Sequence, residues 1–301
     1  MKINHYHNKD IDLDKWDKCV QNAINPAIYP LSWYLHITSP DWEGLFSDDY
    51  KTIVPLPIVK KLGRQVVYQP EFTWQLGIFS SESLNPGVVE NLLSHIPSKY
   101  RIGSYHLNKY NVIESGKYAV YPLQTTELQL ISSYDKIRAE YKSSLHTRVE
   151  RAKQNRVSMV KSITNHDFVN FAYKFDRFNT LRLNPTRLIL LRQIVSNAIR
   201  YRMGEIYGAY TKENNLCAAI FLIHYKGRSI IHYAVSDNDG IESGALYMMI
   251  DNVIITHSGK SIILSVDDPF NSNLSDLLKY FGAKSYTFTK IKTKRFLLNI
   301  K

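Results

Sequence analysis

The segment Gly204–Asp237, GEIYGAYTKENNLCAAIFLIHYKGRSIIHYAVSD, carries the clearest structural pattern in this chain. Three runs rich in β-branched and aromatic residues are separated by Glu213-Asn214-Asn215 and by Lys226-Gly227, which are residue types common in hairpin turns. The alternation within the runs predicts three consecutive antiparallel strands. They are expected over Gly204–Thr211, Leu216–Tyr225 and Arg228–Ser236. A domain built around this meander has a largely antiparallel sheet.

The sequence on either side of the meander shows helical spacing. An apolar stripe before it recurs every three or four residues, which predicts an amphipathic helix. Its members are Ile137, Tyr141, Leu145, Val149 and Ala152. A second helix is predicted over Pro185–Tyr201, with proline in its first turn. After the meander the expected order is helix, strand, helix and strand, at Ser243–His257, Ser261–Val266, Ser272–Tyr280 and Tyr286–Ile291.

The first half follows a similar order. Helices are expected over Ile11–Ile24 and after Ser83, with a hairpin between them formed by Lys51–Val59 and Arg64–Phe72. A chain of 301 residues is also near the size at which one hydrophobic core divides into two. We therefore expect an α+β (α/β layered) fold of two domains, 1–130 and 131–301, with mixed, largely antiparallel sheets flanked by helices.

The positive charge is concentrated in the second half. The formal net charge is +11, yet residues 1–135 hold 12 Lys and Arg against 14 Asp and Glu, while residues 136–301 hold 26 against 13. A basic half is typical of proteins with an anionic partner, such as cofactor phosphates, a nucleic acid or an anionic surface. The alternative is a solvated surface that only keeps the protein soluble.

Other features of the composition exclude several classes of protein. No stretch approaches the roughly 20 consecutive apolar residues that a membrane-spanning helix needs, and the first residues, MKINHYHNKD, are polar. Cys19 and Cys217 are too few and too far apart for a disulfide framework or a metal knuckle. The sequence predicts a soluble, cytoplasmic protein without a membrane span.

Four passages of the second half carry a family resemblance when taken in order. They are SLHTRVERAKQNRVSMV (Ser144–Val160), the meander, DGIESGALYMMIDNVI (Asp239–Ile254) and SIILSVDDPFNSNLSDLLKYFGAKSY (Ser261–Tyr286). Together they resemble the GNAT-type acyltransferases, and more closely the FemAB-like branch, which has two GNAT-like domains in tandem. The resemblance implies two tandem GNAT-like domains in this chain.

The same resemblance implies an N-acyltransferase. Such an enzyme moves an acyl or aminoacyl group to an amine by direct attack, without a covalent enzyme intermediate. No tightly bound cofactor is expected, and acyl-CoA or another acyl carrier is the expected co-substrate. FemAB-like enzymes commonly end with an FKxxFG pattern; here Leu278 takes the lysine position and Lys279 lies one residue along, before Phe281-Gly282. This departure leaves acyl-CoA open as donor and disfavours aminoacyl-tRNA.

The loop that leaves the meander is the candidate donor site. Helix N-termini present free N–H groups and a partial positive charge, which suit a pyrophosphate. The candidate donor-binding residues are Ser236, Gly240, Ser243, Gly244 and Ala245, together with Lys279. Asp237, Asp239 and Glu242 would repel a phosphate, however, so the alternative is a surface loop in which Ser243 caps the helix.

The acidic loop after Ser261–Val266 supplies candidate catalytic groups. Acyl transfer to an amine needs a base for the amine proton and a proton donor for the leaving group. Asp267 or Asp268 is the candidate base and Tyr233 the candidate donor. The alternative is a helix cap at Asn271 or Ser272 with solvated aspartates. No histidine or third carboxylate lies at ligand spacing, so no metal is expected.

Two other classes of function stay open. One is a non-catalytic GNAT-like scaffold that binds a ligand or a protein. The other is an RNA-binding module, for tRNA among others, that uses the basic helix with Arg148, Arg151, Lys153 and Arg156. Stacking aromatics are not interleaved with these charges, so RNA is not favoured, and the helix can equally be a solvated face.

Overall fold

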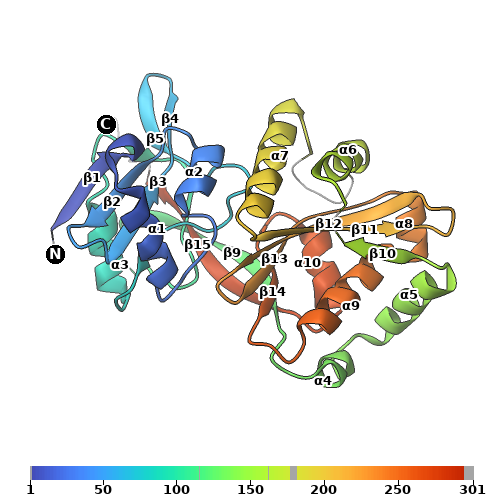
Figure 1. Ribbon diagram of the computed structural model, residues 1–301. Helices are drawn as coiled ribbons and strands as arrows, with labels where there is room; N and C mark the ends of the chain where they lie inside the picture. Colours follow the sequence, from blue (N-terminus) through green and yellow to red (C-terminus); the bar gives the residue numbers. More distant parts are fainter. Residues whose placement is uncertain (1, 115, 162, 177–181, 295–301) are drawn as a thin grey trace, which may run out of the picture. The chain divides into compact units, whose positions relative to one another are not determined.

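The computed structural model describes residues 2–114, 116–161, 163–176 and 182–294 and divides the chain into two compact units (Figure 1). The first unit is Met1–Leu123 with the closing segment from Thr287, and the second is Gln124–Tyr286. The sequence places the boundary at residue 130 and assigns the closing segment to the second domain. The difference arises because β9 (Tyr118–Gln129) and β15 (Lys284–Thr293) each continue through the boundary as strands, without a loop to mark it.

The first unit contains two small sheets with helices around them. One sheet has the order β1-β2-β3-β6, formed by Ile3–His7, Glu43–Ser47, Thr52–Leu56 and Phe79–Ser80. The other has the order β4-β5-β7, formed by Ile58–Lys61, Arg64–Val67 and Arg101–Ile102. The helices are α1 (Leu13–Asn22), α2 (Ser32–Thr38) and α3 (Pro86–Ser94), and β8 (Tyr105–His106) pairs with the end of β15. Trp16 and Trp42 pack at 4.7 Å between ring centroids in the core.

The hairpin predicted over Lys51–Val59 and Arg64–Phe72 is divided between these sheets. Its first run breaks at Pro57, so β3 pairs with β2 and only β4 pairs with β5. Proline has no N–H for a ladder bond, and the Pro57 carbonyl instead accepts from the Tyr68 N–H at 3.1 Å. The predicted hairpin is therefore confirmed where β4 pairs with β5, and it is wrong for Thr52–Leu56, which pairs with β2.

The second unit is built on the meander, as predicted. Its strands follow the order β10-β11-β12-β13-β14-β9-β15, with β8 after β15, so that β13 and β14 are the middle strands of eight. The new strands are β10 (Ser158–Lys161), β11 (Gly204–Tyr210), β12 (Leu216–Tyr225), β13 (Arg228–Ser236) and β14 (Ile263–Val266). Lys226 and Gly227 both have positive φ, 45° and 75°, in the two-residue turn between β12 and β13, as the primed hairpin turns require.

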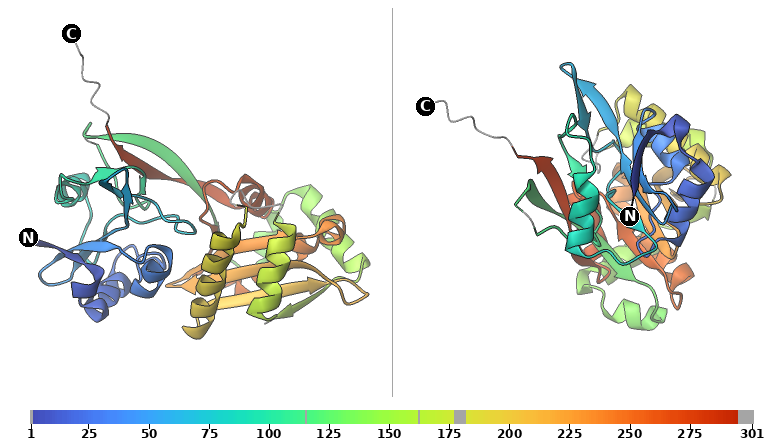
Figure 2. Two further views of the ribbon diagram at one scale, coloured as in Figure 1. Left: turned by 90° about the horizontal axis from the view of Figure 1, so that it is seen from above. Right: turned by 90° about the vertical axis from the view of Figure 1, so that its left-hand side faces the viewer.

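Helices cover both faces of this sheet (Figure 2). α6 (Asn165–Phe175) and α7 (Pro185–Arg200) pack on one face. The other face carries α9 (Ala245–His257), α5 (Ser143–Gln154), α4 (Tyr134–Ala139) and α10 (Ser272–Lys279), which enclose an apolar core. No helix among the described residues is long and apolar enough to cross a membrane.

Two helical predictions need correction. All five residues of the stripe from Ile137 to Ala152 are buried, but they do not share one helix. Ile137 belongs to α4 and the last three to α5, while Tyr141 lies in the connection, where Lys142 adopts an extended conformation. The helix predicted from Ser243 begins at Ala245, and a short helix, α8 (Asn238–Ser243), precedes it. Ser243 is therefore the last residue of α8 and not an N-cap.

Candidate functional site

The parallel strands β13 and β14 separate at their carboxyl ends. They pair only from Arg228 to Ile230, after which β13 continues to Ser236 while β14 ends at Val266. The ladder between β12 and β13 skips His232, which is a bulged residue and is 5% exposed. Ligands bind at the carboxyl ends of parallel strands in many α/β proteins, and bulges are common beside active sites. This end of β13 and β14 is the candidate site.

Asp267, immediately after β14, belongs to a buried charge cluster. Arg228 donates from one guanidinium nitrogen to Glu127 Oε1 at 3.0 Å and to Asp267 Oδ1 at 3.2 Å. Thr125 Oγ1 donates to the same aspartate oxygen at 3.2 Å. The carboxyl groups of Glu127 and Asp267 are 1% and 3% exposed. The cluster therefore connects β9 and β13 with the first residue after β14.

These contacts satisfy the buried carboxylate of Asp267. Its carboxylate is already occupied by a guanidinium and a hydroxyl, and a charge this deeply buried is tolerated only when it is paired. The loop after β14 is thereby held against the sheet. The role of base predicted for Asp267 or Asp268 is better suited to the second of these residues.

Asp268 is half-buried and differs from its neighbour in its partners. Burial raises the pKa of Asp268 to about 6, and hydrogen bonds from the backbone of Phe270 and Asn271 oppose that shift only in part. The Phe270 N–H donates to its carboxylate at 2.9 Å. Among the described residues no Lys or Arg forms an ion pair with it. A carboxyl group with a pKa of about 6 is suited to accept a proton near neutral pH.

Tyr233 lies on β13 but is held by a different element. Its hydroxyl donates to Asp176, the C-cap residue of α6, at 2.6 Å, and its ring meets Phe168 of α6 edge-on. Tyr233 is thus hydrogen-bonded to Asp176, whereas Asp267 is hydrogen-bonded to Arg228. Its predicted role as proton donor stays a prediction.

Ser236 and Gly240 hold α8 against β12. Ser236 Oγ donates to the Cys217 carbonyl oxygen at 3.1 Å. A Cβ atom on Gly240 would lie 2.2 Å from that oxygen and 2.3 Å from Ser236 Oγ. The glycine is therefore required for close packing of the helix on the strand.

Gly244 and Ala245 pack against α5 at the start of α9. Gly244 has φ 79°, and a Cβ there would lie 2.6 Å from the Arg148 carbonyl oxygen. Ala245 is fully buried, and the Ser243 hydroxyl donates to the Gly240 carbonyl at 3.3 Å. The charged residues that line the hollow beside Ser243 are three carboxylates and one lysine, namely Glu213, Asp239, Glu242 and Lys212. These residues do not fit a pyrophosphate, so donor binding by them stays a prediction.

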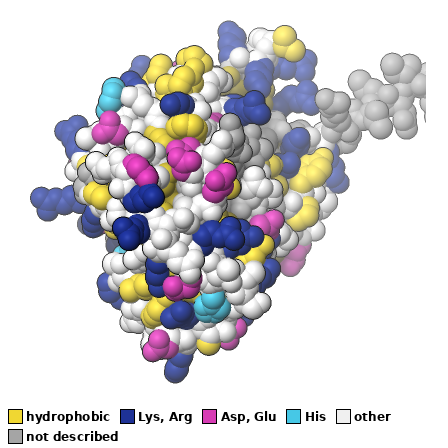
Figure 3. Space-filling view, turned by 90° about the vertical axis from the view of Figure 1, so that its right-hand side faces the viewer, with side chains coloured by type: hydrophobic (Ala, Val, Ile, Leu, Met, Phe, Trp, Pro, Cys, Tyr) yellow, Lys and Arg dark blue, Asp and Glu magenta, His cyan; other side chains and the backbone are white. Residues whose placement is uncertain are grey.

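The basic side chains predicted near the donor lie on solvated surfaces. Lys279 pairs with Asp276 on the same helix at 3.0 Å. Arg148 lies over the Tyr247 ring at 4.9 Å, and Lys153 pairs with Glu150 at 2.8 Å. Figure 3 views the face that carries α5 and α8 and shows Lys and Arg interspersed with Asp and Glu over its middle and lower parts. The described part of the chain also brings no three His, Cys, Asp or Glu together as a metal site.

Sequence reasoning missed Glu127, Arg228 and Thr125. A signal exists in the run QTTELQL (Gln124–Leu130), where Glu127 and Gln129 alternate with Leu128 and Leu130 and Thr125 falls on the same period as Glu127. This period predicts a strand with one polar face. Arg228 gives no such signal, because an arginine after a Lys-Gly turn resembles an ordinary exposed turn residue.

Comparison with solved structures establishes the fold. FemX aligns with a TM-score of 0.63 at 12% identity, covering 96% of this chain and 97% of FemX. L-PGS from Bacillus licheniformis aligns with a TM-score of 0.55 at 12% identity, covering 94% and 92%. The C-terminal domain of a putative lysylphosphatidylglycerol synthetase from Agrobacterium fabrum aligns with 0.54 at 9% identity, covering 94% and 92%. No protein-family model matches the sequence, and no curated protein sequence matches it. The chain has a FemAB-type fold with two GNAT-like domains, as the resemblance predicted.

Proposed function

We propose that this protein is an N-acyltransferase that moves an acyl or aminoacyl group from an ester or thioester carrier, such as acyl-CoA, to an amine. The observation that carries the proposal is Asp268, a carboxyl group with a pKa of about 6 at the end of β14 in a GNAT-like fold. The similarity of this fold to the folds of FemX and of L-PGS also supports the proposal. We propose the cytoplasm as the protein's compartment, since the two cysteines are free thiols, as is usual where the environment is reducing.

In the proposed reaction the amine nitrogen attacks the carbonyl carbon of the donor. The new C–N bond forms, the amine proton passes to the Asp268 carboxylate, and the C–S or C–O bond to the carrier breaks. The leaving thiolate or alkoxide then takes up a proton from water, and Asp268 returns its proton to the solvent. Asp267 contributes indirectly, because its contacts with Arg228 and Thr125 hold the loop that carries Asp268.

The test is acyl transfer from acetyl-CoA and from aminoacyl esters to a panel of primary amines. Asp268→Asn is expected to lower kcat/KM by about 10²- to 10⁴-fold, the usual contribution of a general base. Asp276→Asn is the matched control, since it makes the same chemical change at an exposed ion pair on α10. It is expected to leave the rate within about twofold.

The pH profile separates catalysis from folding. With an arylamine acceptor, which stays neutral across the range, kcat/KM of the native protein is expected to rise through about pH 6 as Asp268 ionises. The profile of any residual activity in Asp268→Asn is expected to be flat. A folded protein that transfers no acyl group from any of these donors would instead support a non-catalytic scaffold.

A further inference from the structure

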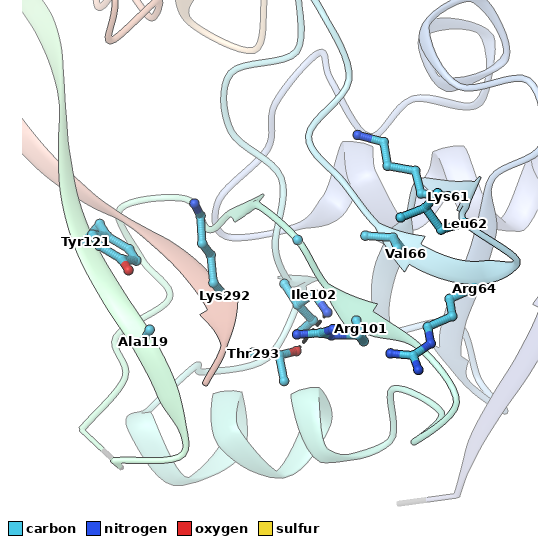
Figure 4. Close-up of a pocket in the computed structure, with 11 residues that line it drawn as sticks. Lys61, Leu62, Arg64, Val66, Arg101, Ile102, Ala119, Tyr121, Lys292 and Thr293 are labelled. Carbon is cyan, nitrogen blue, oxygen red and sulfur yellow. Dashed lines mark hydrogen bonds between the residues drawn. The ribbon is translucent and has the colours of Figure 1, made fainter. Parts of the chain in front are cut away.

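A groove of about 840 Å³ in the first unit is lined by cations and by no carboxylate (Figure 4). Its charged side chains are those of Lys61, Arg64, Arg101 and Lys292. This volume is within the range of small-molecule sites, about 300–1,000 Å³. Every lining residue belongs to the first unit, so the groove is separate from the candidate site at β13 and β14.

The strand register places three of these cations on one face of the small sheet. Lys61 and Arg64 are directly opposite each other in the hairpin β4–β5. Arg64 and Val66 share a face of β5 because side chains alternate along a strand, and Val66 lies beside Arg101 of β7. The alignment follows from backbone pairing and does not depend on the rotamers of long side chains.

Lys292 and Tyr121 close the groove from β15 and β9. The Ile102 N–H donates to Thr293 Oγ1 at 2.8 Å, which fixes the end of β15 beside β7. The ammonium groups of Lys290 and Lys292 lie over the Tyr121 ring at 4.9 and 5.5 Å. Figure 4 shows Lys61 and Arg64 extending from the hairpin, with Lys292 and Tyr121 on the other side of the groove.

This arrangement is unfavourable for the free protein. Like charges directly opposite each other in an antiparallel pair are destabilising, and Lys61 and Arg64 are such a pair. Among the described residues none of the four lining cations forms an ion pair with a carboxylate. Burial and the neighbouring Lys292 also lower the pKa of Lys290. An anion in the groove would relieve this repulsion.

We propose that the groove lined by Lys61, Arg64, Arg101 and Lys292 binds a soluble ligand that carries at least two linked phosphate groups. Arginine forks match phosphate oxygens in two-point contacts, and the four positive charges exceed the charge of one phosphate group, about −2. The concave shape favours a small ligand over a flat lipid surface. The proposal does not depend on acyl transfer, because it concerns binding in the first unit alone.

The test uses inorganic pyrophosphate as the probe and calorimetry as the measurement. Pyrophosphate is expected to bind saturably and at least about tenfold more tightly than orthophosphate at equal ionic strength, since it makes the extra charge-assisted hydrogen bonds. Arg64→Gln/Arg101→Gln is expected to weaken pyrophosphate binding at least about tenfold. Arg151→Gln/Arg156→Gln is the matched control, because it removes the same charge from exposed positions of the second unit, and it is expected to change binding by less than about twofold.

Circular dichroism verifies that each variant folds, and Lys61→Gln/Lys292→Gln replaces the arginine variant if that one does not. The proposal would be overturned if the control variant Arg151→Gln/Arg156→Gln lost as much pyrophosphate affinity as the groove variant. Such a result would show a general effect of net charge. Equal affinity for orthophosphate and pyrophosphate would overturn the proposal as well. The proposal would also be refuted if phosphatidylglycerol vesicles or a single-stranded oligonucleotide bound through the groove cations, with a loss in Arg64→Gln/Arg101→Gln, and pyrophosphate did not compete with that binding.

Discussion

Gly240→Ala adds a methyl group where the structure leaves no room for one. The new Cβ would lie 2.2 Å from the Cys217 carbonyl oxygen and 2.3 Å from Ser236 Oγ. An ordinary carbon–oxygen contact is about 3.3 Å, so α8 and β12 must separate by about 1 Å. That movement would strain the hydrogen bond from the Asp237 N–H to the same carbonyl, 3.0 Å long.

The expected loss of stability is about 2 kcal/mol. Overpacking against groups that cannot repack costs about 1–3 kcal/mol, and a weakened hydrogen bond adds about 1 kcal/mol. The better helix propensity of alanine returns at most about 1 kcal/mol. Gly87→Ala is the matched control, since Gly87 is also helical and its Cβ would meet only Asn85 Oδ1 at 3.4 Å. That variant is expected to be neutral or stabilised by up to about 1 kcal/mol.

Urea unfolding measures both effects and separates the two units. The four tryptophans, Trp16, Trp33, Trp42 and Trp74, all belong to the first unit, so their fluorescence reports on that unit, while far-UV circular dichroism reports on both. Gly240→Ala is expected to lower the midpoint followed by circular dichroism. If Gly240→Ala proves as stable as Gly87→Ala, then the glycine does not serve close packing and its predicted role toward a donor phosphate regains support.

Other substitutions and conditions test the remaining assignments. Arg228→Met is expected to destabilise the protein by about 3–5 kcal/mol in urea unfolding, because it leaves Glu127 and Asp267 buried without their cation; a loss below about 1 kcal/mol would contradict the cluster. Burial raises the pKa of Asp268 to about 6, above the value of 3.8 for the unfolded chain, so its ionisation opposes folding and stability is lost as pH rises through 6. Asp268→Asn is therefore expected to gain about 2–3 kcal/mol over the native protein between pH 4 and pH 8, and a pH-independent difference would refute this reading. Burial lowers the pKa of His106 to about 4. The neutral ring therefore contributes stability above pH 6.5 that is expected to be lost as the pH falls toward 4, and His106→Gln is expected to make stability less dependent on pH between 6.5 and 4. Burial raises the pKa of Cys19 and Cys217 to about 12, so neither thiol is expected to react with a disulfide reagent until urea unfolds the chain.

The sequence by itself determined the parts of the fold that depend on local periodicity. Alternation along 204–236 predicted β11, β12 and β13 within one residue of their ends, because side chains on a strand face opposite sides of the sheet. The stripe from Ile137 to Ala152 predicted which side chains are buried, since helical spacing places them on one face. It did not predict the break at Lys142, which an apolar pattern cannot show.

Only the tertiary structure decided what depends on residues distant in the chain. Charge counted along the sequence located the basic region in the second half, yet the basic groove takes Lys61, Arg64 and Arg101 from the acidic half and Lys292 from a closing strand that belongs to the first unit. Gly240 and Gly244 resemble phosphate-binding glycines in sequence, and their space is filled by the carbonyls of Cys217 and Arg148. Strand order and helix packing set these contacts, and neither leaves a local pattern in the residues concerned, because pairing partners are separated by long stretches of chain.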